Sequence, residues 1–164
     1  MILDASNLHG GIPDDLSLLE YIREIDLDSN SLTGRIPSWL GNMQYLEILD
    51  LDKNVLSGPL PEDLYDAVSL RVVDFDHNII SGTLSTKIGQ LQQLYFFQAD
   101  FNQLIGTIPS EVASLPNLEF FSILGNGFGG SGIPVDVCEL RINIYANCDM
   151  CADLGSCCTE CIEY

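Results

Sequence analysis

The chain has 164 residues, and with 46% hydrophobic residues it is long enough to form one domain with a substantial core. Its 24 acidic and 6 basic residues give a formal net charge of −18, which argues against nucleic acid as a partner because phosphate binding needs a basic face. No apolar run is long enough to cross a membrane. The acidity permits cationic partners or divalent cations, and it is also compatible with a role in solubility alone.

The sequence repeats itself every 24 residues in six units, the first of them partial. Three columns of the repeat show this step most clearly. They are Leu8, Leu32, Leu56, Ile80, Leu104 and Phe128; Gly10, Gly34, Gly58, Gly82, Gly106 and Gly130; and Asn30, Asn54, Asn78, Asn102 and Asn126. This periodicity predicts a stack of similar coils whose apolar sides form one core only when the coils lie together.

Each unit predicts the same local structure. Before the Asn, two apolar residues alternate with polar ones, as Ile25 and Leu27 do, and this is the pattern of a short strand with one face buried. Further upstream, Leu19 and Ile22 occupy apolar columns that we also expect to be buried. The Asn then turns the chain, because its amide can donate to and accept from backbone groups that no strand pairing reaches. A Gly four residues later suits a sharp bend.

The pattern L-x-x-L-x-x-L-x-L-x-x-N-x-L-x-G-x-I-P in these units resembles the plant-type leucine-rich repeat. The resemblance covers residues 1 to about 137. It implies an α/β repeat solenoid in the shape of a right-handed horseshoe. A parallel β-sheet would form its concave face, with short second strands and 3₁₀ or irregular segments on the convex side.

Three departures from the pattern stand out. The first unit has Ser6 in the Asn column, Ser85 replaces Pro in the fourth unit, and the last unit carries one extra residue. The start "MILDASNLHG" has no features of a signal peptide, and the first unit lacks an upstream Leu segment. A bare solenoid end would expose core residues, so we expect further sequence to precede this chain.

All the cysteines lie near the end of the chain, which predicts a Cys-rich cap over residues 138–164, following a solenoid over residues 1–137. They are Cys138, Cys148, Cys151, Cys157, Cys158 and Cys161. An even number in a capping tail favours disulfides, whose connectivity the sequence leaves open. The two C-x₂-C pairs, Cys148 with Cys151 and Cys158 with Cys161, allow a zinc site as the alternative. The tail is also similar to those of secreted or surface leucine-rich repeat proteins of diatoms and related algae.

Aspartates flank the apolar strand residues in several units, and we expect both to point outward on the concave face. The acidic residues in these two columns are Asp26, Asp50 and Asp74, and Asp28, Asp52, Asp76 and Asp100. Carboxylates in neighbouring coils would lie about 5 Å apart, so their repulsion should raise some of their pKa values or attract cations. This grid is either a docking surface for a basic peptide or protein, a weak Ca²⁺ site, or a set of solvating residues common beside the Leu in this repeat.

Aromatic residues gather later on the same face. Tyr95, Phe96, Phe101 and Phe120 form a predicted binding strip beside the acidic grid, unless some of these rings pack against one another or against the cap. No catalytic pair or phosphate-binding loop is apparent, and no cofactor is expected.

The sequence therefore predicts a non-enzymatic, extracellular or cell-surface module that binds a protein or peptide, possibly basic, through its concave face. The alternatives are the ectodomain of a receptor-like protein or kinase, an inhibitor of a wall-degrading enzyme such as polygalacturonase, and a Ca²⁺-bridged structural or adhesive surface protein.

Overall fold

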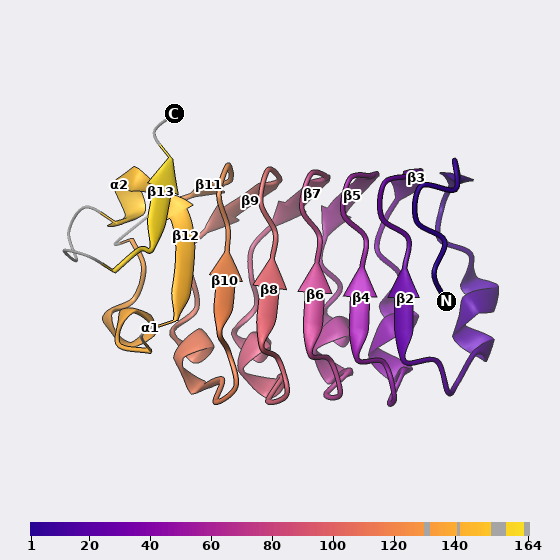
Figure 1. Cartoon of the computed structure of the whole chain (residues 1–164), viewed down its shortest axis with the longest axis horizontal. Coiled ribbons are helices and arrows are strands. Elements are labelled where there is room, and N and C mark those ends of the chain that lie inside the picture. The colour runs from indigo at the N-terminus through magenta and orange to yellow at the C-terminus, as the bar shows by residue number, and fades with distance from the viewer. Residues whose placement is uncertain (130–131, 141, 152–156, 163–164) are drawn as a thin grey trace.

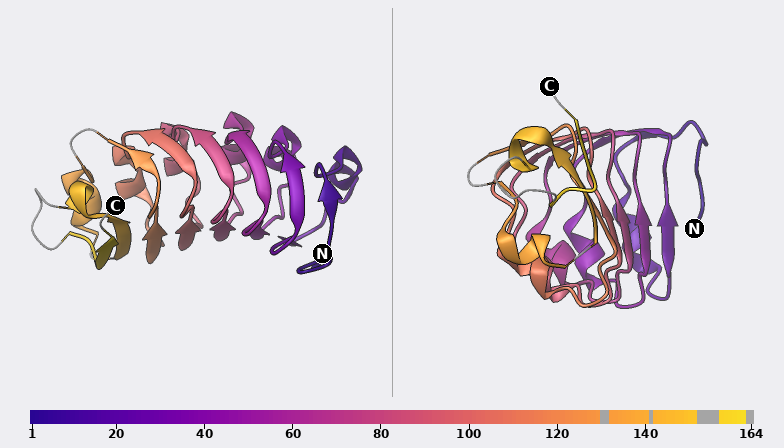
Figure 2. Two further views of the ribbon diagram at one scale, coloured as in Figure 1. Left: turned by 90° about the horizontal axis from the view of Figure 1, so that it is seen from above. Right: turned by 60° about the vertical axis from the view of Figure 1, so that its left-hand side comes forward.

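The protein is a curved stack of coils in which two parallel sheets run along the whole length (Figures 1 and 2). The computed structural model describes residues 1–129, 132–140, 142–151 and 157–162; Gly130 of the glycine column lies outside them. Seven strands form the larger sheet, in the order β13-β12-β10-β8-β6-β4-β2. They are β2 (Glu24–Asp26), β4 (Ile48–Asp50), β6 (Val72–Asp74), β8 (Phe96–Gln98), β10 (Phe120–Ser122), β12 (Asn143–Asn147) and β13 (Glu160–Ile162).

The second sheet and the short helices complete each coil. The second sheet contains β1 (His9–Gly10), β3 (Ser31–Gly34), β5 (Val55–Pro59), β7 (Ile79–Gly82), β9 (Gln103–Gly106) and β11 (Gly127–Phe128), paired in that order. The 3₁₀ helices are η1 (Asp14–Leu18), η2 (Ser38–Asn42), η3 (Glu62–Asp66), η4 (Thr86–Gln90) and η5 (Ser110–Ser114). These features confirm the predicted repeat solenoid with a parallel sheet on its concave face.

The register of the strands places equivalent residues of successive units side by side. Leu49 pairs with Ile25 on one side and with Val73 on the other, each 24 residues away. Because every coil makes the same step, each sequence column becomes a row of side chains running across the strands.

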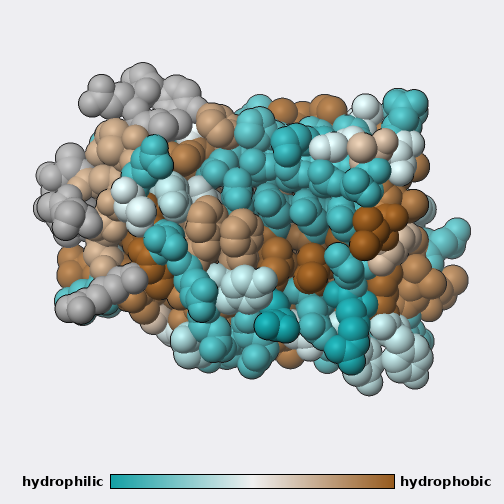
Figure 3. Space-filling view, viewed as in Figure 1, coloured by the Kyte–Doolittle hydropathy of each residue, from teal (hydrophilic) through white to brown (hydrophobic). Residues whose placement is uncertain are grey.

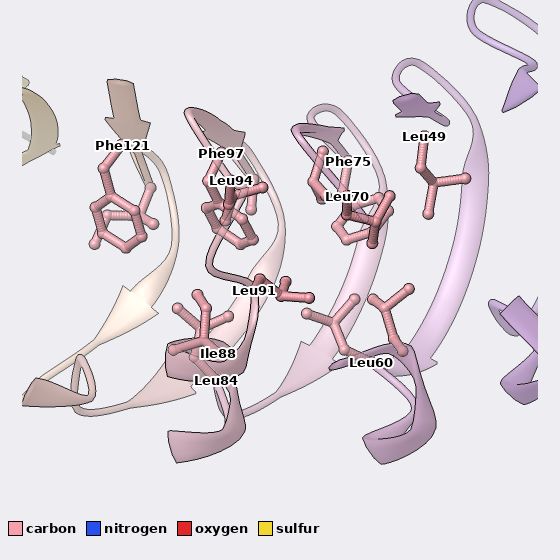
Figure 4. Close-up of a cluster of buried hydrophobic side chains, with 14 of the residues drawn as sticks. Leu49, Leu60, Leu70, Phe75, Leu84, Ile88, Leu91, Leu94, Phe97 and Phe121 are labelled. Atoms are coloured by element: carbon pink, nitrogen blue, oxygen red, sulfur yellow. The ribbon is translucent and has the colours of Figure 1, made fainter. Parts of the chain in front are cut away.

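The core lies between the two sheets and the 3₁₀ helices, and it is continuous from coil to coil. Leu49, Phe75, Phe97 and Phe121 lie at the same level in successive coils (Figure 4), and each is at most 2% exposed. Burying each such side chain contributes about 1.5–3 kcal/mol. The prediction that Leu19 is buried is wrong: it is 44% exposed. The partial first unit pairs with β2 and β3, but it has no residue 24 positions before Leu19 to pack against it.

The side chain of each repeated Asn connects its own turn to neighbouring coils. Asn54 accepts a hydrogen bond from the main-chain N–H of Leu32 at 2.9 Å and donates to the carbonyl oxygens of Leu27, Leu51 and Asp52. Asn30, Asn78, Asn102 and Asn126 make the equivalent bonds. These amides satisfy backbone groups that would otherwise be buried without partners.

The residue just before each Asn adopts a left-handed backbone conformation, which the sequence did not indicate. Ser29, Lys53, His77 and Phe101 have φ angles between 48° and 53°. Gly125 continues the row with φ 64°. The turn therefore imposes this conformation regardless of residue type, and it brings the side chains of Lys53 and His77 back beside the preceding aspartates.

Ser85, the departure from Pro in the fourth unit, has a structural role. Its hydroxyl accepts a hydrogen bond from the N–H of Lys87 at the start of η4. Unlike Pro, it also has an N–H group, which donates to the hydroxyl of Tyr65 at 3.4 Å. The substitution therefore leaves no backbone donor without a partner.

The six cysteines near the end of the chain form three disulfides, as predicted. The zinc alternative is wrong, because sulfurs paired in disulfides are no longer thiolate ligands. The pairs are Cys138–Cys157, Cys148–Cys161 and Cys151–Cys158. The first and third of them tie α1 (Val135–Cys138) and α2 (Cys148–Cys151) to the segment before β13. In this region β12 pairs with β10, so the concave sheet continues past the last repeat. Within the described residues, no helix is both long and apolar enough to span a membrane.

Candidate functional site: the concave face

Three rows of side chains cross the concave face, and each changes in character along the stack. The central row is apolar after its first member and contains Glu24, Ile48, Val72, Phe96 and Phe120. Along one side lie Asp26, Asp50, Asp74, Gln98 and Ser122; along the other lie Arg23, Glu47, Arg71, Tyr95 and Glu119. Figure 3 shows the resulting brown band crossing the face between two teal regions.

The second column of aspartates, which was predicted to be exposed, is largely buried. Asp52 and Asp76 are each 7% exposed and Asp100 is 5% exposed. The left-handed turn is the physical reason in two coils, because Lys53 Nζ lies 2.6 Å from Asp52 Oδ2 and His77 Nδ1 lies 2.9 Å from Asp76 Oδ2. Asp28, in the terminal coil, is half-buried. These buried carboxylates lie two residues further along the chain than Asp26, Asp50 and Asp74, which remain as the accessible acidic row.

Asp100 is a structural acid. Both of its carboxylate oxygens accept hydrogen bonds from the hydroxyl of Ser122, at 2.6 and 2.8 Å, and Oδ1 also accepts one from the N–H of Leu124 at 2.7 Å. Burial raises the pKa of Asp100 above its ordinary value, while these hydrogen bonds lower it. The acceptors of Asp100 are thus occupied within the chain, unlike the carboxylates of the accessible acidic row.

The accessible acidic row has unusual protonation properties. Burial, followed by the charges of neighbouring aspartates, raises the pKa of Asp50 to about 6 and that of Asp74 to about 7. Burial also raises the pKa of Asp26. A hydrogen bond from the N–H of the residue two positions later opposes the rise in each case. The expected rise in pKa is confirmed, but burial contributes more to it than repulsion does.

Two buried carboxylate oxygens beside this row have no hydrogen-bond partner. They are Oδ1 of Asp52 and Oδ1 of Asp76, whose side chains are both about nine-tenths buried. The other oxygen of each carboxylate is occupied by Lys53 or His77, so the negative charge is only partly neutralised. The chain therefore maintains negative potential beside Asp50 and Asp74.

The four predicted aromatic residues occupy three different places. Phe96 and Phe120 stack in the central row, with ring centroids 4.5 Å apart and an angle of 5° between the planes. Tyr95 lies in the adjacent row, where the guanidinium of Arg71 is 5.6 Å from its ring centre. Phe101 lies on the turn and packs against His77 at 4.6 Å. The predicted strip is therefore divided, and only Phe96 and Phe120 belong to the central row.

Tyr145, which the repeat pattern did not indicate, extends the aromatic cluster. Its ring centroid is 5.1 Å from that of Phe120, and β12 places it beside Ser122. The alternation of Ile144 and Ala146 in the core around Tyr145 was the available signal, but the segment lies outside the 24-residue repeat.

A shallow hollow of about 590 Å³ lies at the edge of the face beside Tyr95. Glu47, Arg71 and Glu119 contribute charged side chains to its lining. The Arg71 guanidinium is 3.7 Å from Glu47, which also pairs with Arg23. The basic groups of this row are thus engaged by Glu47 and do not reach the acidic row.

Among the residues that the structure describes, no group of three or more His, Cys, Asp or Glu side chains is arranged to hold a metal ion. The geometry of the grid is that of an extended acidic surface.

The stacked coils, the two parallel sheets and the Asn-bonded turns define a leucine-rich repeat protein. The "Leucine rich repeat" family profile matches residues 7–80. The chain is also 30% identical to the ectodomain of the receptor kinase SOBIR1 from Arabidopsis thaliana, with a TM-score of 0.74 and coverage of 78% of this chain and 70% of that one. The chain therefore belongs to the leucine-rich repeat family.

Two further solved structures are similar. The plant peptide hormone receptor RGFR1, solved in complex with RGF2, is 31% identical with a TM-score of 0.82, over 86% of this chain and 23% of the receptor. The ectodomain of GASSHO1/SCHENGEN3 from Arabidopsis thaliana, in complex with CASPARIAN STRIP INTEGRITY FACTOR 2, is 32% identical with a TM-score of 0.80, over 85% and 17%. The chain thus spans about a fifth of these two receptor chains. No curated protein sequence matches it.

Proposed function

We propose that this chain is a non-enzymatic recognition module that binds a protein or peptide through the concave face. The observation that carries the proposal is the continuous apolar row from Ile48 to Phe120, which is flanked by an acidic row on one side and a mixed charged row on the other. Half-buried rings and aliphatic side chains provide contact area, and the flanking charges provide orientation. The open shape of the face suits an extended ligand.

The proposed location is outside the cell. Three disulfides stabilise the end of the chain, and such bonds persist in oxidising compartments. Similarity to plant receptor ectodomains supports the same location. In this proposal residues 1–137 form the recognition solenoid and residues 138–164 the cap.

A second candidate function is that of an ectodomain of a receptor-like protein or kinase. The observation favouring it is that the similar solved structures are receptors, and two of them were solved with a bound partner, RGF2 or CASPARIAN STRIP INTEGRITY FACTOR 2. A transmembrane segment and a kinase domain in the full gene would support this function over that of a secreted protein.

Selection of displayed random dodecapeptides against the purified protein tests the concave-face proposal. We expect enriched peptides whose binding is abolished by Val72→Ser/Phe96→Ser. The control variant, Val55→Ser/Ile79→Ser, removes two exposed apolar side chains from the second sheet and should leave binding intact. Thermal melts confirm that both variants fold. Enriched peptides that bind both variants equally, or no enrichment at all, would contradict the proposal.

A further inference from the structure

The acidic and aromatic parts of the concave face lie at a fixed separation along the stack. Asp50 and Asp74 are on the adjacent strands β4 and β6, whereas Phe96 and Phe120 are on the next two, β8 and β10. The midpoints of the two pairs are therefore two strand spacings apart, or about 10 Å along the stack. The two features also belong to neighbouring rows, offset along the strands by two residues, or about 7 Å.

The acidic end of the face can bind a positive group, because the described part of the chain does not supply one to pair with Asp50 and Asp74. Its ion pairs use Arg23 and Arg71 on Glu47, on the far side of the apolar row. Lys53 pairs with Asp52, yet Oδ1 of Asp52 and Oδ1 of Asp76 have no partner, in side chains that are nine-tenths buried beside the row. A cationic side chain above Asp50 and Asp74 would lie in the potential of all four carboxyl groups.

The aromatic end offers a place for a ring. Phe96 and Phe120 stack in parallel and remain half-exposed, and Tyr145, which lies beside Ser122 in the neighbouring row, packs against Phe120 at a tilt. Another aromatic or large apolar side chain can pack on this cluster in an offset geometry, which stabilises the contact beyond the area that it buries.

The distance between the acidic pair and the aromatic pair favours one conformation of the ligand and one spacing between its basic and aromatic residues. A polyproline II chain rises about 3.1 Å per residue with three residues per turn, so its residues i and i+3 lie on the same side about 9 Å apart. In a β-strand, residues i and i+3 point to opposite faces, and residues i and i+2 are only about 7 Å apart. The separation of about 10 Å along the stack therefore matches the polyproline II spacing. The long side chain of Arg or Lys covers the offset between the rows.

We infer that the ligand is a peptide segment in polyproline II conformation that carries Arg or Lys three residues from Phe, Tyr or Trp. Its backbone lies along the central apolar row, its cation contacts Asp50 and Asp74, and its ring packs on Phe96 and Phe120. This inference rests on the proposed function and specifies the chemistry of the partner for the same face.

Synthetic peptides test the spacing directly. The probes are fluorescein-labelled Pro-rich nonapeptides with one Arg and one Phe, separated by two, three or four positions in both orders. Fluorescence anisotropy should show that spacing three binds about fivefold more tightly than the others in at least one order, as expected for about 1 kcal/mol from correct placement. Equal affinity at all spacings, or no binding of any probe, overturns the inference.

Charge-removing variants test whether the Arg of the probe contacts Asp50 and Asp74. Asp50→Asn/Asp74→Asn should weaken binding of the spacing-three peptide about fivefold and have no effect on its Arg-to-Gln analogue. Asp63→Asn/Asp66→Asn is the matched control, because it removes the same formal charge from η3. An equal loss with the control variant would indicate non-specific attraction and would overturn the inference.

The random-peptide selection separates the two proposals. Face-dependent peptides without a basic residue three positions from an aromatic one would contradict this inference and leave the proposed function standing. Peptides that bind independently of the face would contradict the proposed function itself.

Discussion

Asn78 donates a hydrogen bond from Nδ2 to the main-chain oxygen of Leu51, 2.9 Å away in the preceding coil. Its Oδ1 atom accepts a bond from the N–H of Leu56, and Nδ2 is also within hydrogen-bond distance of two carbonyl oxygens in its own turn. One buried amide thus joins two coils, and its contribution to stability can be measured.

Asn78→Ala should destabilise the protein by about 3 kcal/mol, because it leaves several buried backbone groups without partners. Urea unfolding followed by circular dichroism measures the change. The control is Asn117→Ala, which removes an exposed side chain with a single hydrogen bond to the Gln92 carbonyl oxygen. A loss of stability for Asn78→Ala no larger than that for the control would show that the hydrogen bonds of the repeated Asn side chains contribute little.

Gly41→Ala should destabilise the stack by about 3 kcal/mol or more, because overpacking forces the backbone to shift. A Cβ atom at this position would lie 1.9 Å from the carbonyl oxygen of Asp63, where η2 and η3 approach each other. Thermal melting measures the effect against Gly129→Ala, whose added Cβ would meet no atom within 4 Å. Equal melting temperatures of the two variants would contradict the close approach of η2 and η3 at Gly41.

Asp74→Asn should stabilise the protein at pH 8 and have little effect at pH 4. Burial raises the pKa of folded Asp74 to about 7, so the folded state retains a proton that the unfolded chain loses above its ordinary value of 3.8. Stability therefore falls as pH rises from about 4 to 7 and is level above that. We expect a gain on the order of 1–2 kcal/mol at pH 8, allowing for solvent screening.

Urea unfolding at pH 4, 6 and 8 measures this dependence. The side-chain oxygen of Asn can still accept the hydrogen bond from the N–H of Asp76, so the change isolates the charge. Asp63→Asn on η3 is the control and should show no comparable pH dependence. A variant that is less stable than the wild type at pH 8 would contradict the raised pKa.

Cys138→Ser/Cys157→Ser should cost about 3 kcal/mol, because this disulfide closes a loop between residues 19 positions apart. The loss should be local, since each coil of a solenoid contacts mainly its neighbours. Hydrogen exchange should accelerate at Ile144 and Ala146 of β12 and stay unchanged at Leu49 of β4. Uniform acceleration along the chain would instead indicate global cooperativity.

The repeat let the sequence predict the fold, because columns such as Leu49 and Val73 are constrained identically in every coil. Burial of Asp52 and Asp76 could not be predicted in this way. It depends on the backbone turn at Lys53 and His77, residues that have no common chemistry and reveal no left-handed preference. The exposure of Leu19 and the position of Tyr145 on the concave face could not be predicted for a related reason. Both residues lie at ends of the stack, where the 24-residue period no longer constrains the structure.

The contacts of Asn78 also bear on how the chain folds. They join residues 22 and 27 positions apart, and the equivalent Asn side chains in the neighbouring coils repeat these separations. Adding another coil to such a chain therefore requires no loop longer than the existing ones. Relative contact order falls as coils are added, so a longer protein of this design need not nucleate more slowly than a short one.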